Sequence, residues 1–67
     1  MMKNQVISAA GNIWKLLQEK GEINIAGIPR LLKEKSVVAY QGLGWLARED
    51  KVQYRKEKEK TFVSLSE

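Results

Sequence analysis

Apolar residues recur every three or four positions through the first twenty residues, which is the spacing of one face of an α-helix. Four side chains form this stripe: Val6, Ala10, Ile13 and Leu17. The pattern predicts a helix over Asn4 to Lys20. Ile7 and Trp14 flank the stripe, and Trp14 is expected to lie in the core. Gly21 is placed to end the helix, because glycine adopts the left-handed conformation of a helix C-terminus at little cost.

Two shorter elements are predicted next. In Glu22 to Ile25, isoleucines alternate with polar residues, which favours a short edge strand. In the following segment, AGIPRLLKEK, Pro29 suits the first turn of a helix, where its missing N–H is not needed. This second helix is expected to span two to three turns and would be marginal in isolation.

A third helix is predicted after a very short connection. Ser36 is the expected N-cap, because its hydroxyl can accept a hydrogen bond from a free N–H of the first turn. Ala39, Leu43 and Leu46, at spacings of four and three, define the inward face of this helix. The helix is expected to end near Asp50.

The outward face of the third helix is nearly uncharged. At 100° per residue it consists of four residues: Val37, Gln41, Gly44 and Arg48. Tyr40 and Trp45 flank it. A glycine in a helix interior costs about 1 kcal/mol relative to alanine, so each glycine here needs a packing reason. Gly42 is expected to let another helix approach closely, and Gly44 to allow close approach of a DNA backbone or a partner chain.

From Lys51 onward the hydrophobic period changes to two. The segments KVQY and TFVSL are typical of strands, and RKEKEK between them suits the exposed tip of a hairpin. The tip contains no Gly or Asn, which two-residue hairpin turns favour, so a longer loop is expected.

The order helix, strand, helix, tight turn, helix, hairpin is that of a winged helix-turn-helix domain. The segment YQGLGWLAREDKV resembles the end of the third helix and the start of the wing in many proteins of that superfamily, and LGWLARED is similar to a family of very small prokaryotic winged-helix proteins. The resemblance implies an α+β fold, with residues 1–67 as a single domain. It also implies that the third helix enters the major groove of DNA.

Composition removes several classes of function. The 67 residues include no Cys and no His, so disulfides and thiol or imidazole catalysis are excluded, and no metal, cofactor or enzymatic activity is expected. Glu49 and Asp50 are adjacent at a helix end and are expected to be solvated. A chain this short has little room for a small-molecule pocket. We expect a homodimer, because oligomerisation is the remaining route to extra burial.

No membrane association is predicted either, because the longest apolar stretch is too short to span a bilayer. The start of the chain also lacks a convincing signal-peptide cleavage site. The expected location is the cytoplasm.

One functional hypothesis is binding to double-stranded DNA, which a net charge of +4 permits. Gln41 could pair with an adenine edge, and Arg48 with a guanine or a phosphate. The third helix would contribute six candidate residues: Ser36, Val37, Tyr40, Gln41, Gly44 and Arg48. The wing would contribute four: Arg55, Lys56, Lys58 and Lys60. Acidic residues are interleaved with these, so a solubilising hairpin tip is the alternative role of the wing.

The other functional hypothesis is a module for protein interaction or homodimerisation that does not bind DNA. Val37, Tyr40 and Trp45 are its candidate interface residues, because an exposed apolar patch on so small a domain marks a contact surface. Tryptophan is also enriched among the residues that dominate binding energy at protein interfaces.

Overall fold

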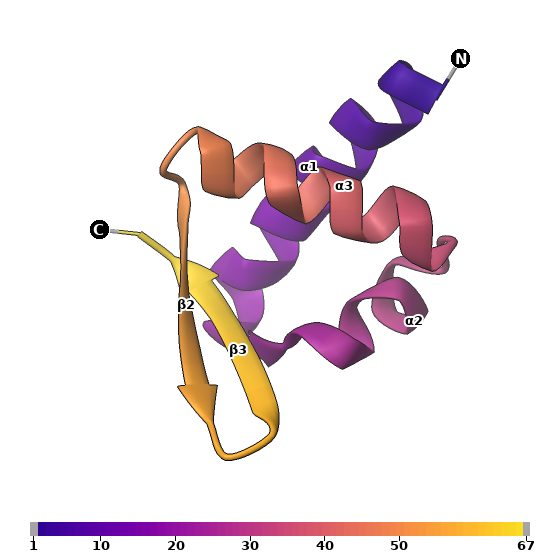
Figure 1. Cartoon of the computed structure of the whole chain (residues 1–67). Helices are drawn as coiled ribbons and strands as arrows, with labels where there is room; N and C mark the ends of the chain where they lie inside the picture. Colours follow the sequence, from indigo (N-terminus) through magenta and orange to yellow (C-terminus); the bar gives the residue numbers. More distant parts are fainter. Residues whose placement is uncertain (1, 67) are drawn as a thin grey trace.

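The computed structural model describes residues 2–66, and within this range the chain forms three α-helices, one short 3-10 helix and three strands. In chain order the elements are α1 (Met2–Lys20), β1 (Glu22–Asn24), η1 (Ile25–Gly27), α2 (Ile28–Leu32), α3 (Ser36–Arg48), β2 (Val52–Glu57) and β3 (Lys60–Leu65). The predicted order of helices and strands is confirmed. The hairpin of β2 and β3 projects beyond the helices (Figure 1).

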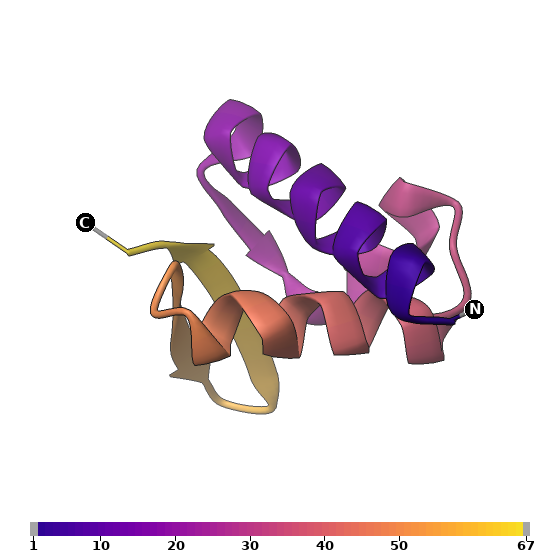
Figure 2. The ribbon, with the colours of Figure 1, turned by 90° about the horizontal axis from the view of Figure 1, so that it is seen from above.

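α1 and α3 cross and pack directly on each other (Figure 2). Gly42 of α3 lies at the crossing, where an added Cβ would come within 2.9 Å of the backbone N of Ala10 and 3.0 Å of Ala9 Cβ. The expectation that Gly42 permits close helix approach is confirmed. Gly44 differs, because a Cβ there would meet nothing within 4 Å.

The core lies between the crossed helices and one face of the sheet. Four side chains are the largest that are fully buried: Ile13, Leu17, Ile28 and Val63. Ala39, Leu43 and Leu46 are buried as predicted, and Val38 of α3 is buried beside them. Every helix and the sheet therefore contribute to one cluster of apolar side chains.

Trp14 does not lie in this core, contrary to prediction, and remains 40% exposed. It sits about 100° around α1 from the fully buried Ile13. α3 crosses α1 at the small residues Ala9 and Ala10, so this flank of α1 is left uncovered.

Gly21 ends α1 as predicted, with a left-handed φ of 84°. Its N–H donates to the carbonyl of Leu17 at 2.8 Å. The chain then enters β1, which is an edge strand as expected, because the antiparallel sheet has the order β1-β3-β2. Ile23 of β1 and Tyr54 of β2 both pair with Val63 of the central strand, which sets the register of the sheet.

The start of α3 differs from prediction by one residue. The N-cap is Lys35, which has extended backbone dihedrals and makes no side-chain capping bond, so the expected Ser36 cap is wrong. The chain leaves α2 through Lys33 in the left-handed conformation, and the extended residue needed before a helix falls on Lys35. Ser36 is thus already helical. Pro29 lies in the first turn of α2, as predicted.

The hairpin tip is shorter than expected. Strand pairing continues to Glu57 opposite Lys60, so only Lys58 and Glu59 form the turn. Lys58 takes a left-handed φ of 56°. This conformation costs a residue other than glycine roughly 1–2 kcal/mol. The six residue pairs between β2 and β3 offset that cost, which is why a tight turn forms without glycine or asparagine.

Candidate nucleic-acid interface

The outward face of α3 is exposed over its whole length. Val37, Gln41, Gly44 and Arg48 are all accessible, with Val37 51% exposed, so the predicted direction of this face is confirmed. Ser36 is also exposed, at the start of the helix. No acidic side chain occurs between Ser36 and Arg48. A polyanion could therefore approach this face without meeting a carboxylate on the helix.

Tyr40 and Trp45 lie on opposite flanks of α3. They are five positions apart in the sequence, which places their side chains about 140° apart around the helix. Trp45 lines a depression with Ile7 and Trp14 of α1. Trp45 thus lies on the flank of α3 that faces α1, and Tyr40 on the other flank. The assignment of Val37, Tyr40 and Trp45 to a partner interface stays a prediction.

Arg55, predicted as a phosphate contact of the wing, is held by carboxylates of its own chain. Its guanidinium donates to both carboxylate oxygens of Glu22, at 2.7 and 3.1 Å, and to Glu57 on its own strand. It also lies over the ring of Phe62, 4.7 Å from the centroid. The arginine thus joins β2 to β1 across the central strand, and its charge is offset before any partner arrives.

This ion pair was not visible in the sequence, because Glu22 and Arg55 are 33 positions apart. The alternation of side chains along a strand did indicate which residues of β2 share a face with Arg55. Gln53, Arg55 and Glu57 share one face of β2, and the register places Ser64, Phe62 and Lys60 opposite them. No comparable signal identified β1 as the element on the far side of β3.

The hydrogen bonds from Arg55 lower the pKa of Glu22 below its ordinary value. Replacing Arg55 by alanine is expected to return that pKa toward its ordinary value. A lowered carboxyl pKa contributes stability above the ordinary pKa, and this contribution is lost as pH falls through the lowered value. The substitution should therefore weaken the acid dependence of unfolding. NMR titration of the Glu22 side-chain carboxyl measures the change.

Lys56→Ala is the matched control for this titration, because Lys56 is the next residue of β2 and lies on the other face of the sheet. It should leave the pKa of Glu22 unchanged. An equal Glu22 titration in the wild type and in Arg55→Ala would contradict the role given to this ion pair.

The three wing lysines are exposed but point in different directions. Lys56 is two residues after Tyr54, so both side chains lie on the same face of β2. This is the sheet face that carries the buried Val63 and packs against the helices. Lys60 lies opposite Glu57, on the face of Arg55. Lys58 is in the turn. Of the three, only Lys60 therefore lies on the sheet face of the Arg55 ion pair.

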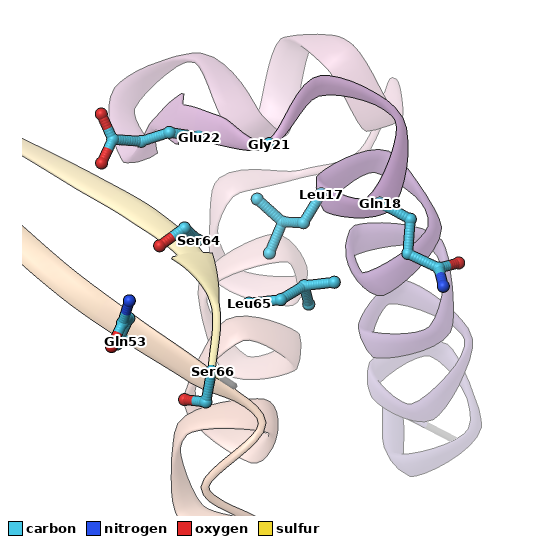
Figure 3. Close-up of a pocket in the computed structure, with 8 residues that line it drawn as sticks. All are labelled: Leu17, Gln18, Gly21, Glu22, Gln53, Ser64, Leu65 and Ser66. Atoms are coloured by element: carbon cyan, nitrogen blue, oxygen red, sulfur yellow. The ribbon is translucent and has the colours of Figure 1, made fainter.

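A broad depression of about 860 Å³ lies between the end of α1 and the sheet (Figure 3). Leu17 and Leu65 point toward each other at its centre, whereas the Gln18 and Glu22 side chains extend away from them. The remaining lining is polar and uncharged, from residues such as Gln53 and Ser64. Since Glu22 is already paired with Arg55, this depression offers no free charged group to a ligand.

No cluster of three or more acidic side chains that could hold a metal ion occurs within residues 2–66. Glu49 and Asp50 are exposed at the end of α3, as expected. None of the helices in this range has the length and apolar character needed to cross a membrane.

Three helices, a short strand and a β2–β3 wing, with α3 exposed along its outer face, define a winged helix-turn-helix protein. The chain belongs to the family described as winged helix-turn-helix domain (DUF2582), whose model matches residues 1–65. The resemblance inferred from LGWLARED and the element order is thereby confirmed at the level of the superfamily.

Known proteins similar to the chain include one curated relative and one solved structure. Uncharacterized protein MJ1608 of Methanocaldococcus jannaschii is 34% identical, over 96% of this chain and 94% of that protein. The solved structure of reduced HlyU from Vibrio cholerae matches with a TM-score of 0.68 and 24% identity, over 98% of this chain and 74% of that one. At that identity, the likeness to HlyU concerns the fold.

Proposed function

We propose that the protein is a DNA-binding winged-helix regulator that inserts α3 into the major groove. The observation that carries this proposal is the outward face of α3, which is exposed and free of acidic side chains. Residues 1–67 act as one domain in this proposal, and the protein works in the cytoplasm, where prokaryotic DNA lies. Its target would be a duplex site whose occupancy controls transcription.

Gln41 and Arg48 are the proposed reading residues. Gln41 can bond both polar groups of an adenine edge, and Arg48 can bond a guanine or a phosphate. Gly44 lies between them on the same face and leaves room for close approach, because none of the residues that the structure describes lies within 4 Å of a Cβ added there. Lys56 and Lys58 of the wing would contact phosphates of the backbone. Arg55 is left out of this set because Glu22 and Glu57 hold it.

The test is a titration with random and genomic duplex DNA at two or more salt concentrations. Each neutralised phosphate contributes a slope of about −0.9 to the dependence of log affinity on log salt. Arg48→Ala is expected to weaken binding by about 1–3 kcal/mol, or roughly 5- to 150-fold, if Arg48 contacts a base. Failure to bind any duplex even at low salt would overturn the proposal.

Lys15→Ala is the matched control, because it removes one positive charge from the side of α1 opposite its buried stripe. It should change affinity much less than Arg48→Ala. Gly44→Ala adds a second discriminating variant. It should stabilise the fold by up to about 1 kcal/mol, since alanine is the better helix former. It should nevertheless weaken DNA binding if the groove lies against this residue.

A second candidate function is protein binding through α3, and the exposure of two apolar side chains on this helix favours it. Val37 is 51% exposed and Tyr40 is 41% exposed. The one charged residue of α3, Arg48, lies at the other end of the helix. Val37→Ala and Tyr40→Ala would then abolish binding to a protein partner. The same variants would leave the weak, salt-dependent affinity for random DNA nearly unchanged.

A further inference from the structure

A second apolar surface lies between α1 and α3, away from the face proposed to meet DNA. Ile7, Trp14 and Trp45 remain 47%, 40% and 43% exposed. They line one shallow depression of about 270 Å³, with Gly11 between the two α1 residues. The sequence separates Trp14 and Trp45 by 31 positions, and the packing of α1 on α3 brings them to one depression.

The fold of one chain does not explain this surface. Among the described residues, nothing lies within 4 Å of a Cβ added at Gly11, so no contact seen in residues 2–66 requires a glycine in the middle of this 19-residue helix. Two exposed tryptophans and an isoleucine around such a gap form a contiguous apolar patch, which in small proteins marks a binding surface. The missing side chain at Gly11 leaves a notch on the exposed flank of α1.

The shape of the patch matches a second copy of itself. Ile7, Gly11 and Trp14 follow one another at spacings of four and three, so they form a single row along α1. This row contains both a large projecting side chain, Trp14, and a notch, Gly11. If a two-fold axis passes between these residues, the Trp14 of each copy enters the Gly11 notch of the other. A two-fold interface requires this kind of self-complementarity.

The charges at the edge of the depression also favour a second copy. One acid and one base, Glu49 and Lys51, lie beside Trp45. A nucleic acid or an acidic protein would be matched by a basic edge, and a basic partner by an acidic one. An edge with both signs can be matched by its own copy, because a two-fold rotation about an axis close to this edge can place Glu49 of each chain opposite Lys51 of the other.

We infer that the surface formed by Ile7, Gly11, Trp14 and Trp45 is a two-fold homodimer interface, with paired Glu49 and Lys51 at its edge. The occupant of the depression is a second copy of this chain. The interface includes no residue of the outward face of α3. It does not depend on DNA binding, so either proposal can fail without the other. Few large side chains take part, and the dimer should therefore dissociate on dilution.

The test is sedimentation velocity over concentrations from micromolar to millimolar, on the full chain. The wild type should pass from monomer to dimer, and Gly11→Ala and Trp14→Ala should each raise the dissociation constant tenfold or more. Gly11→Ala should keep or raise the unfolding midpoint, which separates loss of the dimer from loss of the fold. Leu31→Ala is the control, because it truncates a 45% exposed apolar side chain on α2 that does not line the depression, and it should leave the dissociation constant unchanged.

Charge exchange tests the two-fold arrangement itself. E49K should weaken the dimer by placing like charges opposite each other, and the double variant E49K/K51E should restore it. A protein that stays monomeric up to millimolar concentration would overturn the inference and leave the patch to a different partner. A dimer unaffected by Gly11→Ala and Trp14→Ala would overturn it as well.

Discussion

Replacing Gly42 by alanine is expected to destabilise the protein by about 1–3 kcal/mol, the usual cost of adding a methyl group to a packed core. The added Cβ would lie 2.9 Å from a backbone nitrogen of α1 and 3.0 Å from Ala9 Cβ. Backbone cannot rotate away as a side-chain end can, so α1 would have to move from α3. A 67-residue domain rarely has more than about 3–5 kcal/mol of stability, so much of the total is at risk. Chemical denaturation measures the loss.

Gly44→Ala is the matched control, since it makes the same chemical change two residues further along the same helix. Nothing lies within 4 Å of its added Cβ, so the helix should become more stable by up to about 1 kcal/mol. The two variants should thus change stability in opposite directions. If Gly42→Ala stabilised the protein as much as Gly44→Ala, the close crossing of α1 and α3 would be wrong.

Replacing Ile13 by alanine is expected to cost about 2–5 kcal/mol, the range for large aliphatic side chains truncated in a core. Ile13 is fully buried in the cluster that joins the helices to the sheet. Against the modest stability of so small a domain, the variant should be largely unfolded at room temperature. Loss of the cooperative thermal transition, followed by circular dichroism, is the measurement.

Trp14→Ala provides the comparison, because it removes a larger side chain from the neighbouring position. Trp14 is 40% exposed, so its truncation should cost clearly less than that of Ile13 when both are measured on dilute, monomeric protein. The sequence alone would rank Trp14 as a core residue of similar importance. A greater loss of stability in Trp14→Ala than in Ile13→Ala would show that the flank of α1 is buried after all.

The two proposed surfaces would have separate roles: the outward face of α3 would bind DNA, and the surface between α1 and α3 would form the dimer. α3 presents Gln41 and Arg48 outward, whereas Trp45 turns toward α1 and joins Ile7 and Trp14. A dimer built on the second surface would give two copies of the first, as is usual for winged-helix readers of symmetric DNA sites. The spacing of the two α3 helices would then set the spacing of the half-sites.

The wing contributes less positive charge than its composition suggests. Of the four basic residues first assigned to DNA, Arg55 is paired with Glu22 and Glu57, and Lys60 lies on the face of that ion pair. Lys56 and Lys58 remain for phosphates. DNA binding by one copy should therefore be weak and only moderately dependent on salt. Dimerisation would add the contacts that one copy lacks.

Local spacing was enough to predict the order of the helices and strands and the inward face of α3. The second helix is shorter than the predicted two to three turns, because α2 has only five residues and follows a separate 3-10 turn. Ala39, Leu43 and Leu46 are buried and Val37, Gln41 and Arg48 are exposed because helix geometry turns each residue by a constant angle. Gly21 and Pro29 marked helix ends correctly, because each limits the backbone at its own position. Such properties belong to short segments and do not depend on what packs against them.

Contacts between distant segments were decided only by the tertiary structure. The exposure of Trp14 depends on where α3 crosses α1, and the state of Arg55 depends on a carboxylate two strands away. The tight turn at Lys58 forms because the paired strands outweigh its backbone cost. The sequence by itself thus determined the fold and the face that α3 turns outward. The packing of the elements decided which charges are free and where the second apolar surface lies, because both depend on segments that meet only after folding.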